Sequence, residues 1–371
     1  MSLFKNLFGK KSKPANPYEA FWKWFTQHSS TFFTVVKQQK NIEADFFDKL
    51  TPKLKLTGHE FWFVTGMHND TTAELILTAD GEIKDFVFVE ELVSAAPAIQ
   101  NWKITALKPS LNIKDVTINM AGYTFSRDNL HFYANEHNDY ADEIDITIVH
   151  NDYTEDSAKA ITNGVFIFLD NYLGELNFAT AIDNMTVTGK NEAEKELIPI
   201  EKLKEFLLWR EKEFIEKYEG TKGNTNDNQY SMFEATTKDN KPAIAIINTE
   251  LLKWDSKASH PWIVEITIKY DGSGNNGLPD NNTYNLINKV EDDILLHLKD
   301  ADGYLNIGRE TANNERQVYF ACKEFRKPSK VLYYVMKQYA GTLEVDYTIY
   351  IIRISTGNPS TGIQQVRLHF A

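Results

Sequence analysis

An internal repeat constrains the first half of this chain more than any other feature. The segment that starts at Glu60, EFWFVTGMHNDTTAELILTADG, aligns without a gap with NLHFYANEHNDYADEIDITIVHND, which starts at Asn129. Each copy alternates apolar and polar residues on both sides of a His-Asn-Asp turn, which indicates two strands joined as a hairpin. A helical run and a further strand follow each copy. The sequence therefore predicts two β-β-α-β units in tandem.

These units are expected to form one α+β domain, in which an antiparallel sheet carries both helices on a single face. A long helix precedes them, because Asn16 is a good N-cap residue and Pro17 suits the first helical position. The run PIEKLKEFLLWREKEFIEKYEG predicts a closing helix, with Gly220 beyond its end as a C-cap. The repeat places helices at 86–97 and 156–173 and strands at 103–108 and 183–188.

The C-terminal part shows a different order of elements. A hairpin with strands near 230–236 and 242–247 precedes a β-α-β-β-α-β series, which is the order of the ferredoxin-like split unit. This order predicts a four-stranded antiparallel sheet with two helices on one face, extended by the hairpin. The series consists of the strand WIVEITIKY, a helix at 283–299, the strands GYLNIGRET and RQVYFACK, a helix at 329–340 and the strand EVDYTIYIIRI.

Polar and basic segments separate these parts. Residues 1–15 form a basic tail that we expect to be flexible, with a peripheral contact to anionic lipid or an acidic protein surface as the alternative. Residues 221–229, TKGNTNDNQ, have the composition of a linker. We therefore predict an N-terminal α+β domain over 16–220 and a C-terminal domain over 230–371.

The composition argues against several classes of function. The formal net charge of -12 disfavours a nucleic-acid binder, because such proteins carry a basic surface that neutralises phosphates. The single cysteine, Cys322, excludes an intramolecular disulfide and fits a reducing, cytoplasmic compartment. We expect its side chain to pack in the core or at a strand edge. No segment reaches the roughly 18 apolar residues of a membrane span.

A glycine pattern gives the strongest enzyme signal in the chain. Residues 271–280 read DGSGNNGLPD, in which Gly272, Gly274 and Gly277 match the Gly-x-Gly-x-x-Gly pattern of dinucleotide sites. In such sites the third glycine lies in the helix whose N-terminus faces the pyrophosphate, whereas here a helix is expected only from Thr283. We therefore expect no NAD or FAD and interpret the segment as a flexible flap over a sheet edge.

Three His-Asn-Asp triplets, which begin at His68, His137 and His150, offer metal-ligating side chains. The first two lie in expected turns, where asparagine and aspartate are favoured for backbone reasons, and the third precedes a helix that Asp152 or Thr154 can cap. The Asp-x-Asp-x-Asp-Gly pattern of a calcium loop is absent from the acidic segment near them. Structural roles outweigh metal binding, and we assign no metal, catalytic or cofactor-binding residue.

A run of acidic residues surrounds the second of these triplets. It includes Asp139, Asp142, Glu143 and Asp145, and Asp145 alternates with apolar neighbours, so its side chain is expected to face solvent. One interpretation is a solvated hairpin. The other is a docking surface for a basic protein partner, which would raise the association rate at low salt.

The C-terminal part also resembles a known family. GLPD after an aromatic-ended strand, a helix with Glu291, and then IGRETANNERQVYF are similar to a bacterial family called domain of unknown function 695. The resemblance covers about residues 228–355 and supports the C-terminal boundary, while the family carries no assigned chemistry. Some members are joined to a domain that resembles a protein inhibitor of ribonuclease E, which would imply a protein-binding regulator.

The same segment holds a second candidate binding surface. Its residues are Gly277, Pro279, Arg309, Thr311 and Arg316. The last three flank the tight turn ANNE, where they either converge on an anion or lie exposed at the hairpin end.

The features together predict a cytoplasmic, non-enzymatic protein that binds or regulates a protein partner. The alternative is an enzyme whose site lies between the domains or under the 271–282 loop. A deep pocket with buried, pKa-shifted carboxylates or histidines would favour the enzyme, and a flat sheet face with an apolar patch would favour binding.

Overall fold

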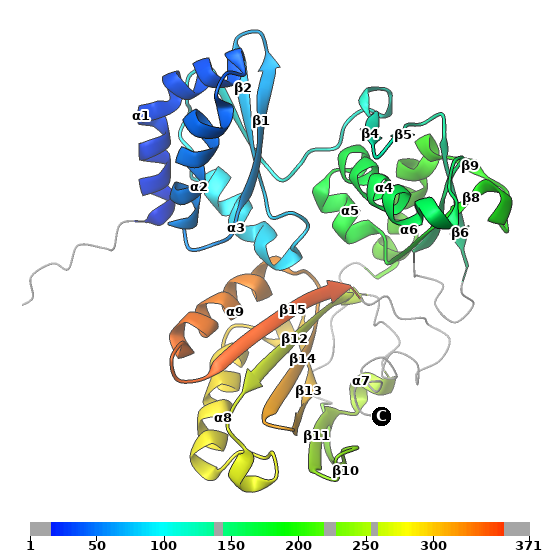
Figure 1. The fold of residues 1–371 in the computed structure, drawn as a ribbon. Coiled ribbons are helices and arrows are strands. Elements are labelled where there is room, and N and C mark those ends of the chain that lie inside the picture. The colour runs from blue at the N-terminus through cyan, green and yellow to red at the C-terminus, as the bar shows by residue number, and fades with distance from the viewer. Residues whose placement is uncertain (1–15, 137–143, 219–227, 254–258, 352–371) are drawn as a thin grey trace, which may run out of the picture. The chain divides into compact units, whose positions relative to one another are not determined.

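The computed structural model describes residues 16–136, 144–218, 228–253 and 259–351 (Figure 1). Contacts between Cα atoms divide the chain into two compact units, Met1–Pro109 and Ser110–Ala371. This division falls inside the stretch that the sequence assigns to one N-terminal domain. The expected linker at 221–229 lies mostly outside the described residues, so a boundary there stays a prediction. None of the described helices is long and apolar enough to cross a membrane.

A long aromatic helix opens the first unit. Helix α1 (Pro17–Gln38) begins as the sequence predicts, because the Asn16 side chain accepts a hydrogen bond from the Tyr18 N–H at 3.1 Å. Its aromatic stripe is buried, and the Trp22 indole N–H donates to the Leu92 carbonyl at 2.6 Å. The stripe is therefore core, as its spacing indicates.

The first unit carries a three-stranded mixed sheet. In chain order its elements after α1 are η1 (Glu43–Phe47), α2 (Asp48–Lys55), β1 (Trp62–Asn69), β2 (Thr72–Thr78), α3 (Ile83–Ser94) and β3 (Trp102–Ala106). β1 pairs antiparallel with β2, and β2 pairs parallel with β3. At the first His-Asn-Asp triplet, the Asn69 side chain accepts from the Thr71 N–H at 3.0 Å, which is the turn role predicted for it.

The following part of the chain, up to α6, builds a second mixed sheet of strand order β8-β7-β6-β9. β6 and β7 are antiparallel, whereas β7 and β8 are parallel. The elements are η2 (Ile113–Asp115), β4 (Ile118–Met120), β5 (Tyr123–Phe125), β6 (Leu130–Asn135), β7 (Asp145–His150), η3 (Glu155–Ser157), α4 (Ala158–Leu173), α5 (Glu175–Ala181), β8 (Asn184–Gly189), η4 (Lys190–Glu192), β9 (Ile198–Pro199), η5 (Ile200–Lys202) and α6 (Leu203–Tyr218).

The expected single antiparallel sheet over the repeat is wrong. The structure has two separate sheets, and each contains a parallel pair. The reason lies in the helix of each unit: a helix that connects two neighbouring strands crosses the sheet and returns the chain in its original direction, so the two strands must run parallel.

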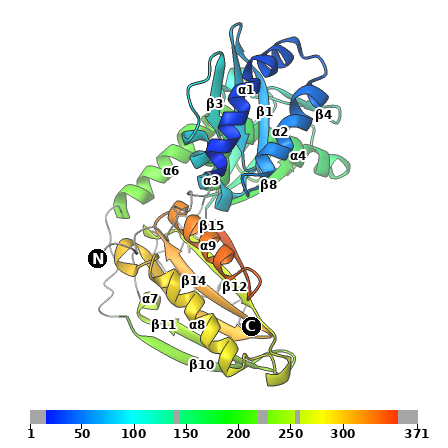
Figure 2. The same cartoon turned by 90° about the vertical axis from the view of Figure 1, so that its left-hand side faces the viewer.

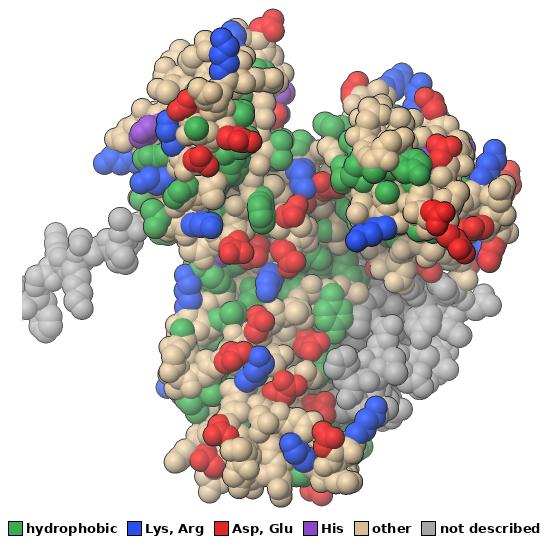
Figure 3. Space-filling view, viewed as in Figure 1, with side chains coloured by type: hydrophobic (Ala, Val, Ile, Leu, Met, Phe, Trp, Pro, Cys, Tyr) green, Lys and Arg blue, Asp and Glu red, His purple; other side chains and the backbone are tan. Residues whose placement is uncertain are grey.

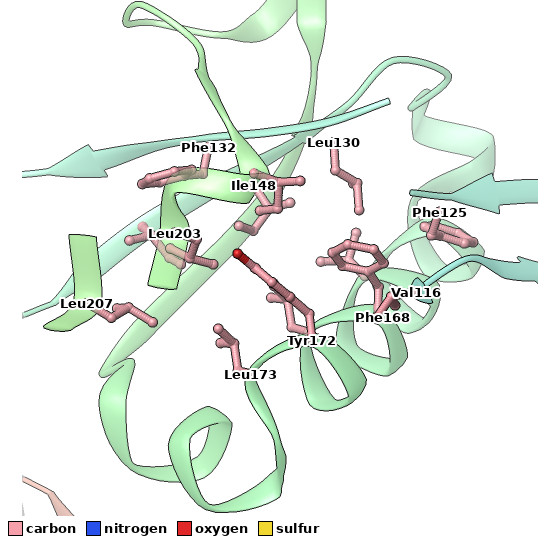
Figure 4. Packing of buried hydrophobic residues seen from close by; sticks show 14 of the residues in the cluster. Val116, Phe125, Leu130, Phe132, Ile148, Phe168, Tyr172, Leu173, Leu203 and Leu207 are labelled. Carbon is pink, nitrogen blue, oxygen red and sulfur yellow. The ribbon is translucent and has the colours of Figure 1, made fainter. Parts of the chain in front are cut away.

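The core of the second sheet packs α4 and α6 against β6 and β7. Figure 4 shows Phe168 and Tyr172 of α4 facing Ile148 and Leu130, with Leu203 beside them. The Phe125 ring of β5 can approach α4 closely only because residue 164 is a glycine. A Cβ at Gly164 would lie 2.0 Å from that ring. The Tyr172 hydroxyl leaves the apolar cluster by donating to the Glu201 carbonyl at 2.9 Å.

The C-terminal sheet has six strands in the order β10-β11-β13-β14-β12-β15, and every neighbouring pair is antiparallel. Its elements are β10 (Tyr230–Thr236), β11 (Pro242–Asn248), α7 (Glu250–Lys253), β12 (Trp262–Lys269), η8 (Ser273–Asn275), α8 (Asn281–Leu295), η9 (Asp300–Asp302), β13 (Tyr304–Ala312), β14 (Glu315–Cys322), α9 (Arg326–Tyr339) and β15 (Glu344–Ile351). The predicted hairpin extends this sheet at the β10 edge.

Two helices, α8 and α9, lie side by side on one face of this sheet (Figures 1 and 2). Between them and the sheet lies an apolar core that includes Ile266, Ile287 and Leu332. Cys322 is fully buried at the end of β14, which confirms its predicted packing role, and burial raises the pKa of its thiol. Figure 2 shows β10 beyond α8, at the edge of the sheet.

Candidate functional site

The edge strand β10 is the most exposed strand of the C-terminal sheet. Six of its seven residues are exposed, including Tyr230 at 47%, Met232 at 63% and Phe233 at 48%. Side chains alternate along a strand, so Phe233 points to one face, and Tyr230 and Met232 point to the other. Since the part of the chain that the structure describes places no helix over β10, these apolar side chains meet solvent.

The register shows which face of β10 and β11 lies on the helix side. Met232 pairs with Ile246, and Ile246 pairs in turn with Arg309, whose side chain contacts helix α8. The helix-side face of the two strands, called the open face below, is formed by Tyr230, Met232, Glu234, Ile244 and Ile246.

Two hollows lie between α8 and the open face. The larger has a volume of about 580 Å³, and Tyr230, Leu295 and Leu298 belong to its lining. The smaller has a volume of about 180 Å³ and lies against Met232. Ile246 and Arg309 line both hollows, so Arg309 stands where the two meet.

A cluster of three charged residues forms the floor of this region. The Glu291 carboxylate accepts a hydrogen bond from Arg309 Nη1 at 2.5 Å on one oxygen and from Arg316 Nη1 at 2.6 Å on the other. Glu291 and Arg316 are buried, and the Arg309 side chain is 24% exposed. Two guanidinium groups and one carboxylate leave a formal charge of +1, and arginine does not release its proton at physiological pH.

The two arginines differ in how far their donors are satisfied. Arg316 donates from Nε to Thr311 Oγ1 and from Nη1 to Asn288 Oδ1, each at 2.8 Å, and its guanidinium lies 5.1 Å from the Tyr284 ring centroid. Arg309 donates only to Glu291 among the residues that the structure describes. Arg309 therefore retains N–H donors for a group that enters the hollows.

A β-bulge sets the direction of the Arg309 side chain. The pairing of β13 with β14 shifts register between Asn306 and Gly308, which turns Arg309 and Thr311 toward α8. Gly308 has a φ of 146°, and a Cβ there would lie 2.2 Å from the Ile246 carbonyl oxygen. Only glycine permits β11 and β13 to approach this closely.

Four of the five C-terminal residues singled out in the sequence come together here. Arg309, Thr311, Arg316 and Pro279 all line the smaller hollow. The interpretation as exposed hairpin-end residues is wrong for Thr311 and Arg316, which are buried. Burial follows from strand alternation, because both side chains lie on the helix side of the sheet, directly opposite one another. Gly277, the fifth residue, lies in the loop between β12 and α8 and has a φ of 87°.

The glycine loop is fixed to its surroundings. The Gly277 carbonyl accepts hydrogen bonds from the Asn314 N–H at 2.9 Å and from the Tyr270 hydroxyl at 3.0 Å. These hydrogen bonds tie the loop to the turn between β13 and β14, and its expected flexibility stays a prediction. Its N–H groups are also engaged: those of Asn275 and Gly277 both donate to the Gly272 carbonyl at 2.9 Å.

The start of α8 differs slightly from the sequence prediction. The helix begins at Asn281 instead of Thr283, and Asp280 caps it by accepting from the Thr283 N–H at 2.8 Å. Gly277 still lies outside the helix. The internal use of the loop N–H groups and the carboxylate at the helix start support the expectation that no dinucleotide binds here, which stays a prediction.

The acidic hairpin lies largely outside the described residues. Asp139, Asp142 and Glu143 fall in the segment 137–143, as does the second His-Asn-Asp triplet. Asp145 is described, and its carboxylate accepts from Asn135 Nδ2 at 2.9 Å. The expectation that Asp145 simply faces solvent is wrong, because it is half-buried and takes part in a cross-strand hydrogen bond.

The histidines of the first and third triplets, His68 and His150, interact with neighbouring protein groups. His68 Nδ1 lies 3.4 Å from Glu74 Oε2, and His150 Nδ1 accepts from the Asp152 N–H at 3.1 Å. The predicted capping residue Thr154 shares reciprocal hydrogen bonds with Ser157 at the start of η3. Within the described ranges, no group of three or more potential metal ligands occurs.

Other apolar side chains are also exposed. Figure 3 shows hydrophobic side chains over α4 and α5, where Phe166 and Ile167 are exposed, and Trp209 is exposed on α6. The open face is the candidate site because it combines exposed apolar side chains with two hollows and a charged floor.

Sequence reasoning missed Tyr230 and Met232 as site residues. Their alternation along a short strand was a signal, but it is the same signal that a strand with one buried face gives. What distinguishes them is the position of β10 at the sheet edge, beyond α8, and that depends on pairing between distant segments.

Of the comparisons with known proteins, one finds a match, and it covers the C-terminal part of the chain. The chain matches no curated protein and no solved structure. Residues 230–350, which include the open face, the arginine cluster and both helices, match the model of a family of unknown function, DUF695, and this confirms the resemblance seen in the sequence.

Proposed function

We propose that this protein is a non-enzymatic protein-binding or regulatory protein and that its partner docks on the open face. The observation that carries the proposal is the exposure of Met232 and Tyr230 on a sheet face that α8 and α9 leave uncovered. Sheets in folded domains bury their apolar face against another layer. Covering these side chains would remove apolar surface from water, which contributes roughly 25 cal/mol per Å².

The larger hollow supports the same proposal. Its volume of about 580 Å³ lies between the exposed ring of Tyr230 and two leucines, Leu295 at the end of α8 and Leu298 just beyond it. Aromatic and methionine side chains beside a shallow hollow are typical of protein interfaces. A partner side chain can enter the hollow while its backbone lies over β10 and β11.

The enzyme alternative has one structural feature in its favour. Asn275, Leu278 and Pro279 of the 271–282 loop line the smaller hollow, so a hollow does lie under that loop. Its charged groups are arginines, which hold their protons and bind anions rather than transfer protons. Both oxygens of Glu291 are occupied by these arginines. The arrangement therefore supports binding more than acid-base chemistry.

The test uses two adjacent residues that point to opposite faces. Met232→Glu places a charge on the open face, and Phe233→Glu places the same charge on the other face of the same strand. Both variants and the parent chain serve as bait for affinity capture from native lysate at moderate salt. The proposal predicts a captured protein that Met232→Glu loses and Phe233→Glu retains. Equal loss or equal retention by the two variants would contradict it.

A second surface on the acidic hairpin remains a proposal for a basic partner. Because Asp145 is hydrogen-bonded, the variant should neutralise only Asp139, Asp142 and Glu143. Slower association and a flatter salt dependence would support docking there, since exposed charges act mainly on association rates. Unchanged capture of every partner, with an unchanged melting temperature, would end this proposal.

Three further proposals concern the cellular location, the fold of the C-terminal part and the origin of the repeat. The single, buried cysteine supports a cytoplasmic location. The strand order β13-β14-β12-β15 supports a ferredoxin-like unit over residues 262–351. The shared pattern of one antiparallel and one parallel pair supports the two β-β-α-β units as copies of one ancestor. Superposition of the two units in an experimental structure would test the last point.

A further inference from the structure

We propose that the partner presents an acidic amphipathic helix, which lies on the open face beside α8 and places a carboxylate on Arg309. This inference rests on the proposed function, because it names the chemistry of the segment that docks. It concerns two features of the site, the width of the uncovered face and the charge of its floor.

The width of the open face suits one helix. Two strands, β10 and β11, extend beyond α8, and neighbouring strands lie about 4.8 Å apart, so the uncovered strip is about 10 Å wide. An α-helix with its side chains has a diameter of about 10 Å. A single helix would therefore complete the layer that α8 and α9 begin.

The side of α8 that borders this strip is suited to a neighbouring helix. Leu295 is 37% exposed, and it lines the larger hollow together with the buried Leu298. Tyr284 is 41% exposed at the other end of α8 and lines the smaller hollow. An amphipathic helix that covers Met232 would also pack against these side chains. Its apolar stripe is wide enough to contact both the open face and the neighbouring side of α8.

Charge complementarity selects an acidic segment. The cluster of Arg309, Arg316 and Glu291 carries a formal charge of +1, and solvent screens it weakly because Arg316 and Glu291 are buried. Arg309 is partly exposed, lines both hollows and has N–H donors without a described protein partner. A carboxylate fits these donors, since guanidinium binds carboxylate through charge-assisted hydrogen bonds.

Two further acids near Arg309 do not cancel this preference. Asp300 lines the larger hollow, but so does Lys299, whose charge offsets it. Glu234 lies on β10 opposite Ile244, one strand further from Arg309, and it is exposed to solvent, which screens its charge. A lysine placed over Arg309 would instead bring two like charges together in the hollow. The site therefore discriminates against basic helices as well as favouring acidic ones.

The experiment selects ligands from a displayed library of amphipathic helices whose apolar face and one central position are randomised, against the full-length chain. Selected helices are then synthesised, and their affinities are measured by fluorescence anisotropy. We expect enrichment of Asp or Glu at the central position. Binding should weaken at least tenfold for Arg309→Gln, less for Arg309→Lys, and stay within twofold for the control Arg127→Gln, which removes an exposed guanidinium from the turn between β5 and β6.

Changes in the peptide keep the test independent of the stability of any protein variant. Replacing the central acid by glutamine should weaken binding to the unaltered protein about tenfold, and replacing it by lysine should weaken it further. Helices that bind in a Met232-dependent way but show no acidic preference would overturn this inference and leave the proposed function standing. A selection that yields no Met232-dependent helix would overturn both.

A second copy of the chain is the remaining candidate for the open face. Sedimentation velocity of the parent chain and of Met232→Glu distinguishes it. We expect both to sediment as the same species. A dimer that Met232→Glu dissociates would assign the open face to self-association and overturn the partner helix.

Discussion

At the scale of single residues, the charged cluster under α8 depends on one carboxylate. Glu291 accepts hydrogen bonds from both arginines. Without its carboxylate, the two guanidinium groups would have only the neutral oxygens of Thr311 and Asn288 nearby. Breaking a buried ion pair by removing one partner is strongly destabilising, because a charge is left without compensation.

Glu291→Gln should therefore lower the free energy of unfolding by about 3 kcal/mol. The adjacent Asp292→Asn removes a carboxylate from an exposed position of the same helix and should change it by less than about 0.5 kcal/mol. Urea unfolding of both variants measures the difference. Equal stability of the two would show that the cluster contributes no more than a surface charge.

A buried histidine makes stability depend on pH. Burial, with the nearby Lys323 ammonium, lowers the pKa of His260 from 6.5 to about 4. The unfolded chain therefore binds a proton between these two values that the folded chain does not bind. The resulting stability is fully present above pH 6.5 and is lost as the pH falls toward 4.

Between pH 7 and pH 5 this histidine should account for a loss of about 2 kcal/mol in the free energy of unfolding. His260→Gln should remove that part of the loss, so the stability of the variant should fall less between the two pH values. Urea unfolding at pH 7 and pH 5 measures both chains. Identical losses would show that His260 is not the titrating group.

The residues of the charged floor were partly predictable from sequence. Arg309, Thr311 and Arg316 stand out as polar residues around a tight turn, but their burial does not, because Glu291 lies 18 residues before Arg309 and pairs with it only through the fold. The exposure of Met232 could not be predicted from the sequence either, because it depends on how far α8 extends over the sheet.

At the scale of elements, local signals placed most helices and strands correctly. α1 begins at Pro17 as its Asn-Pro cap indicates, and the hairpin strands β10 and β11 lie within one residue of their predicted ends. Strand direction was the error. Apolar alternation identifies a strand but carries no information on the direction of its neighbour, which the connecting helices decide.

The bulge of β13 is the element feature on which the site depends most. Gly308→Ala should destabilise the protein by about 3 kcal/mol, because its Cβ would clash with the Ile246 carbonyl and its φ of 146° is unfavourable for alanine. Gly274→Ala, in the loop before α8, has open space around its Cβ and should change stability by less than about 0.5 kcal/mol. Thermal unfolding compares the two, and a tolerated Gly308→Ala would contradict the close approach of β11 and β13.

At the scale of the whole molecule, the chain divides where the sequence shows no break. The two compact units meet between Pro109 and Ser110, within the stretch predicted as one domain. The repeat suggested a common sheet, whereas each copy has a sheet and core of its own. No composition change marks this boundary, because the connecting segment after β3 is short and contains apolar as well as polar residues.

Residues 16–109 should therefore fold without the rest of the chain. Their core includes Trp22, Phe25 and Phe86, all buried within this unit. The isolated fragment should show a cooperative thermal transition in circular dichroism, since it carries its own hydrophobic core. A fragment that is unfolded at low temperature would contradict the division into two units.

The central claim is that a partner docks on the open face of the C-terminal sheet. Its most direct test is site-specific photo-crosslinking from a benzoylphenylalanine introduced at position 232 or, in a separate chain, at position 233, followed by mass spectrometry. The proposal predicts a crosslinked partner from position 232 and none from position 233, because the two side chains point to opposite faces of β10. Crosslinks of equal yield from both positions, or none from position 232, would contradict it.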